Sequence, residues 1–74
     1  MYKRMRDLRE DRDLVQKEVA AVLGTNQRVY SNYETGKRDL PLKHAIKLAQ
    51  FYGVSLDYLV GMTNDHKPYK PIDD

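Results

Sequence analysis

Residues 16–36, QKEVAAVLGTNQRVYSNYETG, decide the fold of this chain. Two short runs of helix-forming residues meet at Gly24, a residue suited to the left-handed conformation that ends a helix. Apolar side chains recur at helical spacing in both runs, and they are Val19, Leu23, Tyr30 and Tyr33. We therefore predict two helices, over residues 16–23 and 27–34, that pack together through these side chains.

The second of these helices presents polar side chains on its outer face. They are two amides, a guanidinium and a hydroxyl, from Gln27, Asn32, Arg28 and Ser31. Such groups hydrogen-bond to base edges in the major groove, where Arg suits guanine and Gln or Asn suits adenine. The spacing predicts a helix-turn-helix over residues 16–35 whose second helix reads DNA.

Apolar periodicity predicts three further helices, which gives an all-α fold, a compact five-helix bundle. The first covers residues 2–11, the fourth follows Pro41 and stops at Gly53, and the fifth begins after the capping residue Ser55. The other side chains that we expect to face inward are Met1, Met5, Leu8, Val15, Val22, Leu42, Ala45, Ile46, Ala49, Tyr52, Leu56, Leu59 and Val60.

Length and composition limit the classes of protein that this chain can represent. Seventy-four residues are enough for one small domain, which we place at residues 1–61, with a mobile tail at 62–74. There is no cysteine, no apolar run long enough for a membrane span and no signal-peptide pattern, so we expect a cytoplasmic protein. The net charge is +2, a modest basic balance.

Several short motifs, in order along the chain, resemble those of the Cro/repressor-type helix-turn-helix family, also called XRE. They are Leu8-Arg9-Glu10, the run QKEVA at 16–20, Gly24, the run YETGKR at 33–38 and the run GVSLDYL at 53–59. The resemblance covers about residues 4–61. It implies a phage-repressor type of DNA-binding domain and a transcriptional regulator that acts without cofactors on double-stranded DNA, commonly as a homodimer on a palindromic operator.

The same resemblance implies roles for individual residues. Gln27, Arg28, Ser31 and Asn32 lie at or beside positions that read bases. Phosphate-contacting positions correspond to Gln16, Asn26, Lys37 and Arg38. Arg9 and Glu34 match an internal ion pair. We further expect a dimer interface that includes Tyr58, Leu59, Val60 and Met62.

Two positions depart from the family pattern. Val15 stands where a Ser or Thr usually caps the helix that begins at Gln16, so the cap must come from another residue, such as Asp13, or be absent. Thr25 occupies a turn position that is commonly aliphatic. Neither change lies on the predicted DNA-binding face.

Other functions find less support in the sequence. His44 and His66 lack the helix-spaced His, Cys or Glu partners of a metal site, and we expect both to be surface residues. No phosphate-binding loop or nucleophile–base motif is present, so we do not expect an enzyme. The main alternative is a protein-interaction module, such as an antitoxin or partner-binding regulator, that uses the same fold without reading DNA.

Overall fold

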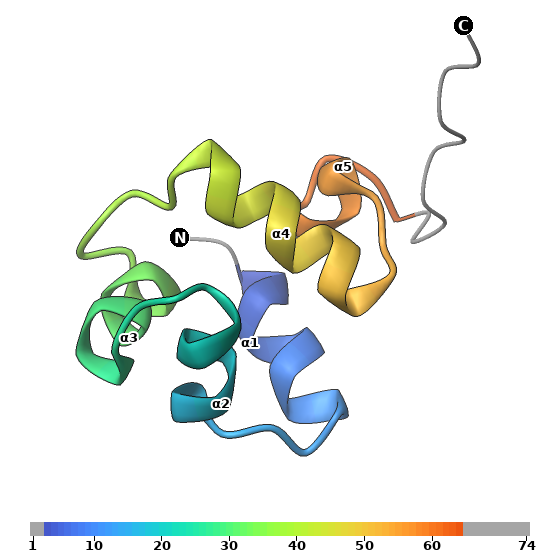
Figure 1. Ribbon diagram of the computed structural model, residues 1–74. Helices are drawn as coiled ribbons and strands as arrows, with labels where there is room; N and C mark the ends of the chain where they lie inside the picture. The colour runs from blue at the N-terminus through green and yellow to red at the C-terminus, as the bar shows by residue number, and fades with distance from the viewer. Residues whose placement is uncertain (1–2, 65–74) are drawn as a thin grey trace, which may run out of the picture.

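The computed structural model describes residues 3–64, and within them five helices form a single bundle (Figure 1). The helices are α1 (Lys3–Asp11), α2 (Gln16–Val22), α3 (Gln27–Thr35), α4 (Leu42–Tyr52) and α5 (Leu56–Leu59). Helix α2 packs mainly against α3, and α4 against α5, while α1 contacts both α3 and α5. Helix α1 therefore joins the two pairs. Met1 and His66 lie outside the described residues.

The core contains most of the apolar side chains that the helical spacing predicts in α1, α2 and α3, although Val22 of α2 is only half-buried and lies outside it. Met5, Val19 and Tyr30 are fully buried, and Leu8 and Leu23 are nearly so. These residues come from three different helices, and together they hold α3 at a fixed angle to α1 and α2.

The prediction for α4 is partly wrong. Its buried stripe is Ala45, Leu48, Ala49 and Tyr52, whereas Leu42 and Ile46 are 66% and 42% exposed. Helix α4 carries two overlapping apolar stripes, and the helix turns the one containing Leu48 toward the core. Leu42 and Ile46 are consequently left on its outer flank.

The connection between α1 and α2 contains a second difference. Val15 is 57% exposed and does not face inward. Asp13, which has a positive φ of 54°, ends α1 instead of capping α2. Its N–H donates to the carbonyl of Glu10 at 3.0 Å, and the Leu14 N–H donates to that of Arg9 at 3.1 Å, the pattern of a Schellman motif. Helix α2 thus begins at a residue without a capping side chain.

Two arginines of the α1 region anchor distant backbone. The Arg12 guanidinium donates to the carbonyl of Tyr52 at 2.8 Å, at the C-terminal end of α4. Arg4 donates to the carbonyls of Tyr58 and Thr63 and to Oδ1 of Asn64, and its guanidinium lies 4.0 Å from the centre of the Tyr58 ring. Residues up to Asn64 are therefore tied to α1, beyond residue 61, where the sequence predicted the end of the domain.

Candidate nucleic-acid interface

Backbone hydrogen bonds fix the turn between α2 and α3. Gly24 has a φ of +70°, its N–H donates to the carbonyl of Ala21 at 3.1 Å, and the Thr25 N–H donates to that of Ala20 at 3.0 Å. Asn26 then caps α3, because its Oδ1 accepts a hydrogen bond from the Val29 N–H at 2.9 Å. The first turn of α3 is held in place before any ligand binds.

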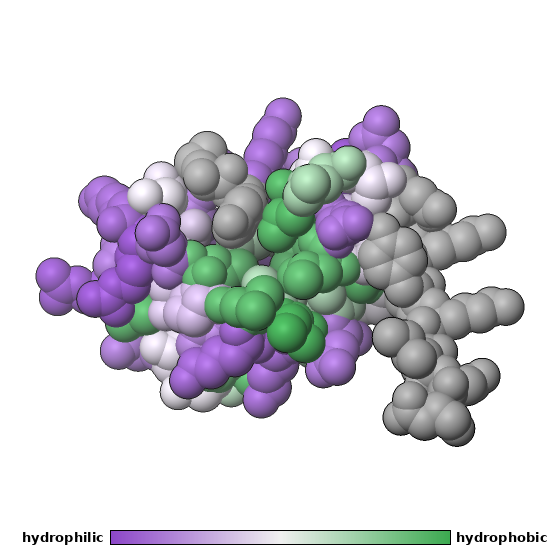
Figure 2. All heavy atoms as spheres, turned by 90° about the horizontal axis from the view of Figure 1, so that it is seen from above, coloured by the Kyte–Doolittle hydropathy of each residue, from purple (hydrophilic) through white to green (hydrophobic). Residues whose placement is uncertain are grey.

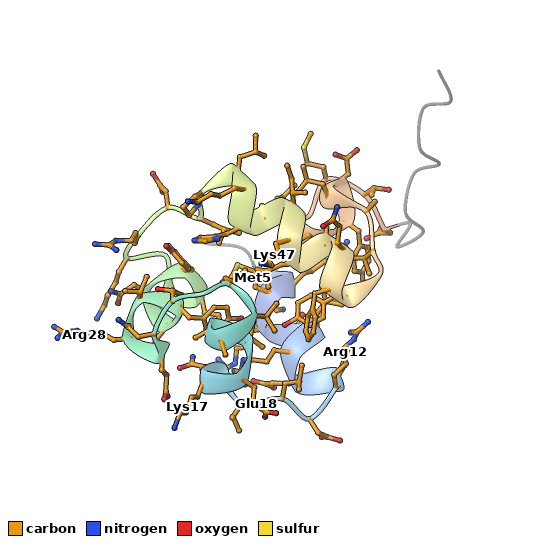
Figure 3. All side chains as sticks on the ribbon, viewed as in Figure 1. Met5, Arg12, Lys17, Glu18, Arg28 and Lys47 are labelled. Carbon is orange, nitrogen blue, oxygen red and sulfur yellow. The ribbon has the colours of Figure 1, made fainter. Side chains whose placement is uncertain are left out.

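Helix α3 separates buried and accessible side chains as its sequence predicts. Tyr30, Tyr33 and Glu34 are buried, Gln27 and Arg28 are exposed, and Ser31 and Asn32 are half-buried. Val29 packs against the core. Figure 3 shows Arg28 extending away from the body of the protein at the outer side of α3.

One open surface hollow collects most of the predicted DNA-contacting residues. Its lining consists of Gln16, Gln27, Arg28, Ser31, Asn32 and Lys37. Six of the eight predicted base-reading and phosphate-contacting residues therefore share one surface. The hollow is lined entirely by amides, a hydroxyl and cationic groups, and no carboxylate contributes to it.

The remaining two predicted residues lie at the ends of α3. Asn26 uses its side-chain oxygen to cap the helix, which leaves its amide nitrogen as a donor at the N-terminal end. At the other end, Gly36 has a φ of +81° and lets the chain reverse. The Arg38 N–H then donates to the carbonyl of Asn32 at 3.1 Å, which ties the segment with Lys37 and Arg38 to α3.

A buried carboxylate connects this surface to the core. Glu34 is 7% exposed, and its Oε2 accepts a hydrogen bond from Nε of Arg9 at 2.7 Å. Its Oε1 accepts longer bonds, both 3.3 Å, from the Arg9 guanidinium and from Nε2 of Gln16. The ion pair that the resemblance implied is thus present, and it also holds Gln16, at the first turn of α2.

The surroundings of Glu34 set its protonation state. Burial by itself raises the pKa of the Glu34 carboxyl, but the hydrogen bonds that the carboxylate accepts, the strongest of them from Arg9, together with the positive charge of Arg9 lower its net pKa below 4.5. Glu34 is therefore a carboxylate at neutral pH. Its charge is compensated internally by Arg9, and Glu34 does not contribute to the lining of the hollow.

The tyrosines of the described residues serve mainly as packing groups. Tyr30, Tyr33 and Tyr52 are buried, and burial raises the pKa of Tyr52 to about 12. The Tyr33 ring lies 5.9 Å from that of His44, which is half-buried on α4. Burial and the neighbouring Lys43 and Lys47 lower the pKa of His44. Within residues 3–64, no group of three His, Asp or Glu side chains is placed to hold a metal ion.

The structure revises the expected dimer interface. Leu59 is completely buried inside the single chain, so it cannot contribute to a surface, and we withdraw it. Tyr58 and Val60 are half-buried, and the Arg4 guanidinium covers the Tyr58 ring. Met62 is 79% exposed.

In residues 3–64, no helix has the length and apolar character needed to cross a membrane.

The Helix-turn-helix family model matches residues 5–59. The cryptic phage CTXphi transcriptional repressor RstR of Vibrio cholerae is 46% identical over 57 residues, which are 77% of this chain and 51% of the repressor. The uncharacterized HTH-type transcriptional regulator YobD of Bacillus subtilis is 36% identical over 69 residues, 92% of this chain and 62% of that protein.

A third relative is the HTH-type transcriptional regulator ImmR of Bacillus subtilis, 39% identical over 59 residues, which are 80% of this chain and 46% of ImmR. The chain spans about half to three fifths of the length of these relatives. No solved structure gave a significant match.

Proposed function

Because this chain belongs to the Cro/repressor-type helix-turn-helix family, we propose that it is a transcriptional regulator that binds double-stranded DNA in a sequence-specific manner. The single observation that carries the proposal is the chemistry of the α3 surface. Its accessible side chains are amides, a hydroxyl and cations, and the one carboxylate of α3, Glu34, is buried against Arg9. A phosphate-lined groove would meet no exposed acid on this helix.

In the proposed complex, α3 lies in the major groove and divides the contacts between two sets of residues. Gln27, Arg28, Ser31 and Asn32 face the base edges and supply the sequence preference. Gln16, Asn26, Lys37 and Arg38 flank α3 and contact phosphates, which fixes its register without reading sequence. The hydrogen bond from Arg38 to Asn32 supports this division, because it holds the phosphate-binding segment at a set distance from α3.

We further propose that the protein acts as a homodimer on a near-palindromic operator. Two copies related by a two-fold axis present two α3 helices to successive major grooves, about 34–36 Å apart. A domain of this size offers one helix, α3, to the major groove, and a single helix reads only a few base pairs. A second copy would double the number of base pairs that are read.

Two variants separate base reading from phosphate contact. After selection of bound sites from random duplex DNA, Arg28→Ala should lose about 1–3 kcal/mol of discrimination at one base position of each half-site. Lys37→Ala should weaken binding to all sequences. It should also reduce the slope of log affinity against log salt concentration by about one, because one phosphate contact is lost. Lys3→Ala is the matched cationic control, because Lys3 is exposed on α1, and α1 contributes no side chain to the hollow.

The outcome of the selection decides between this proposal and the protein-interaction alternative. Enrichment of a defined site, lost at one position in Arg28→Ala, supports DNA reading. If selection enriches nothing and the affinity for DNA is insensitive to salt, the chain does not read DNA, and the same fold must be serving as a protein-interaction module.

A further inference from the structure

Two tyrosine hydroxyls are buried in the core of the bundle. They belong to Tyr30 of α3, which is completely buried, and to Tyr52 of α4, which is 4% exposed. Within residues 3–64, neither hydroxyl makes a hydrogen bond of normal distance and angle. A buried hydroxyl without a partner costs free energy, and phenylalanine would fill the same space without that cost. An acceptor inside the core would remove the cost.

Glu34 is the acceptor that the geometry of α3 brings to Tyr30. The two residues are four apart in the helix, so their side chains lie one turn apart on the same face. Among the described residues, three hydrogen bonds reach the carboxylate from other helices: Oε1 accepts from Arg9 and Gln16, and Oε2 accepts from Arg9. Because each carboxylate oxygen can accept about two hydrogen bonds, Oε2 has room for one more donor.

The outer side of Glu34 lies at a surface groove, so the additional donor must come from the core side. Besides Arg9, the α1 side chains that line this groove are Lys3, Arg6, Asp7 and Glu10. Arg6 is paired with Glu10 at 2.6 Å. On this outer side, Arg9 and Gln16 supply the hydrogen bonds to the carboxylate that the described residues make. Tyr30, one turn earlier and completely buried, lies on the inner side.

The ring of Tyr52 is held in place at the end of α4. Arg12 donates to the Tyr52 carbonyl at 2.8 Å, and its guanidinium lies 4.9 Å from the centre of the Tyr52 ring. The Phe51 ring meets it edge-on, with the ring centres 5.1 Å apart. Seen from the α4 side, apolar side chains form one continuous patch over the molecule (Figure 2). That direction offers the Tyr52 hydroxyl little polar surface, so its partner lies in the core.

The electrostatic surroundings of both tyrosines include Glu34. Burial is the largest cause of the raised pKa of Tyr30, and interaction with the Glu34 carboxylate adds to it. Burial, and after it the negative charge of Glu34, raises the pKa of Tyr52 to about 12, while Tyr30 acts on Tyr52 in the opposite sense. The two hydroxyls and the carboxylate therefore influence one another, as neighbouring groups do.

We propose that Tyr52 and Tyr30 form a buried chain of hydrogen-bond donors that ends on Glu34. The Tyr30 hydroxyl donates to the carboxylate, and the Tyr52 hydroxyl donates to the Tyr30 oxygen, so each hydroxyl has a partner. A donor on the core side fixes the plane of the carboxylate and hence the direction of Oε1, which accepts from Gln16. Tyr30 is thus a positioning residue for Gln16. This last step rests on the proposed function, in which Gln16 contacts a phosphate.

NMR titration of the side-chain carboxyls in the full chain tests the donor chain. Tyr30→Phe should raise the pKa of Glu34 by about one pH unit, the equivalent of a lost hydrogen bond to a charged group. Tyr52→Phe should raise it by less, and should have no effect in a Tyr30→Phe background, because the chain is already broken. Tyr33→Phe is the matched control: Tyr33 is also a buried tyrosine of α3, its ring lies against His44, and the pKa of Glu34 should not change.

Three results of the titration would overturn the donor chain. They are a wild-type pKa of Glu34 in Tyr30→Phe, an equal rise in Tyr33→Phe, and an undiminished effect of Tyr52→Phe in the Tyr30→Phe background. A crystal structure of wild type gives a second test that needs no variant. Oη of Tyr30 should lie within about 3.0 Å of a Glu34 oxygen, and a separation beyond about 3.5 Å would contradict the proposal.

DNA binding tests the positioning role separately. Tyr30→Phe should weaken binding to all sequences by about threefold without changing the base preference. Gln16→Ala and the double variant Gln16→Ala/Tyr30→Phe should bind equally, because Tyr30 acts through Gln16. A further loss in the double variant would overturn the positioning role. If wild type binds no DNA, the proposed function fails, whereas the titration of Glu34 still decides whether the donor chain exists.

Discussion

The side-chain amide of Gln16 donates to Oε1 of Glu34 at 3.3 Å, although the two residues lie on different helices. The same carboxylate accepts two hydrogen bonds from Arg9. One buried group thus connects α1, the first turn of α2 and the last turn of α3. Because Gln16 is a predicted phosphate contact, Glu34 determines where that contact lies relative to α3.

Replacing Glu34 with Gln should destabilise the fold by about 3 kcal/mol, because it leaves the largely buried Arg9 with only the exposed Glu10, 3.9 Å away, as a counter-ion. Urea denaturation at pH 7 measures this effect. Arg6→Gln is the control: it removes an exposed pair with Glu10, whose side chains are 69% and 51% exposed, and should leave the denaturation midpoint unchanged. Equal losses in the two variants would mean that the Glu34 pair contributes no more than a surface pair.

The lowered pKa of Glu34 predicts the pH range over which this contribution disappears. A carboxyl whose folded pKa lies below its ordinary value of 4.5 stabilises the fold fully above that pH and loses its effect as the pH falls toward the folded pKa. The difference in unfolding free energy between wild type and Glu34→Gln should stay constant from pH 7 to about 5, and shrink below about 4.5. A difference that grew with acid would have the wrong sign for this mechanism.

Helix α2 begins with only half of a capping box. Glu18 accepts a hydrogen bond from the Val15 N–H at 3.0 Å, but valine has no side-chain acceptor for the N–H groups of the first turn. Val15→Ser should supply that acceptor and stabilise the protein by about 1 kcal/mol. Thermal denaturation of Val15→Ser beside Val15→Ala separates the new hydrogen bond from the loss of an exposed apolar side chain, and equal melting temperatures would exclude the capping effect.

Asp13 adopts a left-handed conformation, with a φ of 54°, at the end of α1. Glycine reaches this conformation without the steric cost that a β-carbon imposes. Asp13→Gly should therefore raise the unfolding free energy by about 0.5–1 kcal/mol, and Asp13→Ala should lower it. If both variants changed stability in the same direction, the backbone conformation at this residue would not be the cause.

The sequence predicts the helix boundaries well because local chemistry sets them. Asn26 and Ser55 cap α3 and α5 through their own side chains, and Gly24 and Gly53 adopt positive φ where helices end. The clustering of Gln16, Arg28 and Lys37 in one hollow follows from these boundaries and from the buried faces of α2 and α3. Such features depend on neighbours only a few residues away.

The features that the sequence did not predict depend on contacts across the fold. Leu48 and Ile46 belong to overlapping apolar stripes of α4, and only packing against the other helices decides which one is buried. The anchoring of the Tyr52 carbonyl by Arg12 spans 40 residues, and Arg4 reaches Asn64 over 60. No local sequence pattern indicates that the guanidinium of such an arginine hydrogen-bonds to a backbone carbonyl far along the chain.

Gln16 offers the sharpest test of the proposed phosphate contacts, because its amide is uncharged. One N–H of Nε2 is directed to Glu34, and the second is the donor that the proposed complex assigns to a phosphate. Gln16→Ala should weaken binding to every sequence by about 1.5–3 kcal/mol, the range for a hydrogen bond to a charged group. Its salt dependence should match that of wild type, since no cation is removed and no additional counterion is released.

Anisotropy titrations of Gln16→Ala and Lys37→Ala against one operator, at four or more salt concentrations, distinguish the two kinds of phosphate contact. The two variants should lose affinity at low salt, and only Lys37→Ala should show a flatter slope. Unfolding measurements on Gln16→Ala must accompany them, because the variant also loses its bond to Glu34. A change of slope in Gln16→Ala, or a loss confined to one base position, would remove Gln16 from the phosphate-contacting set.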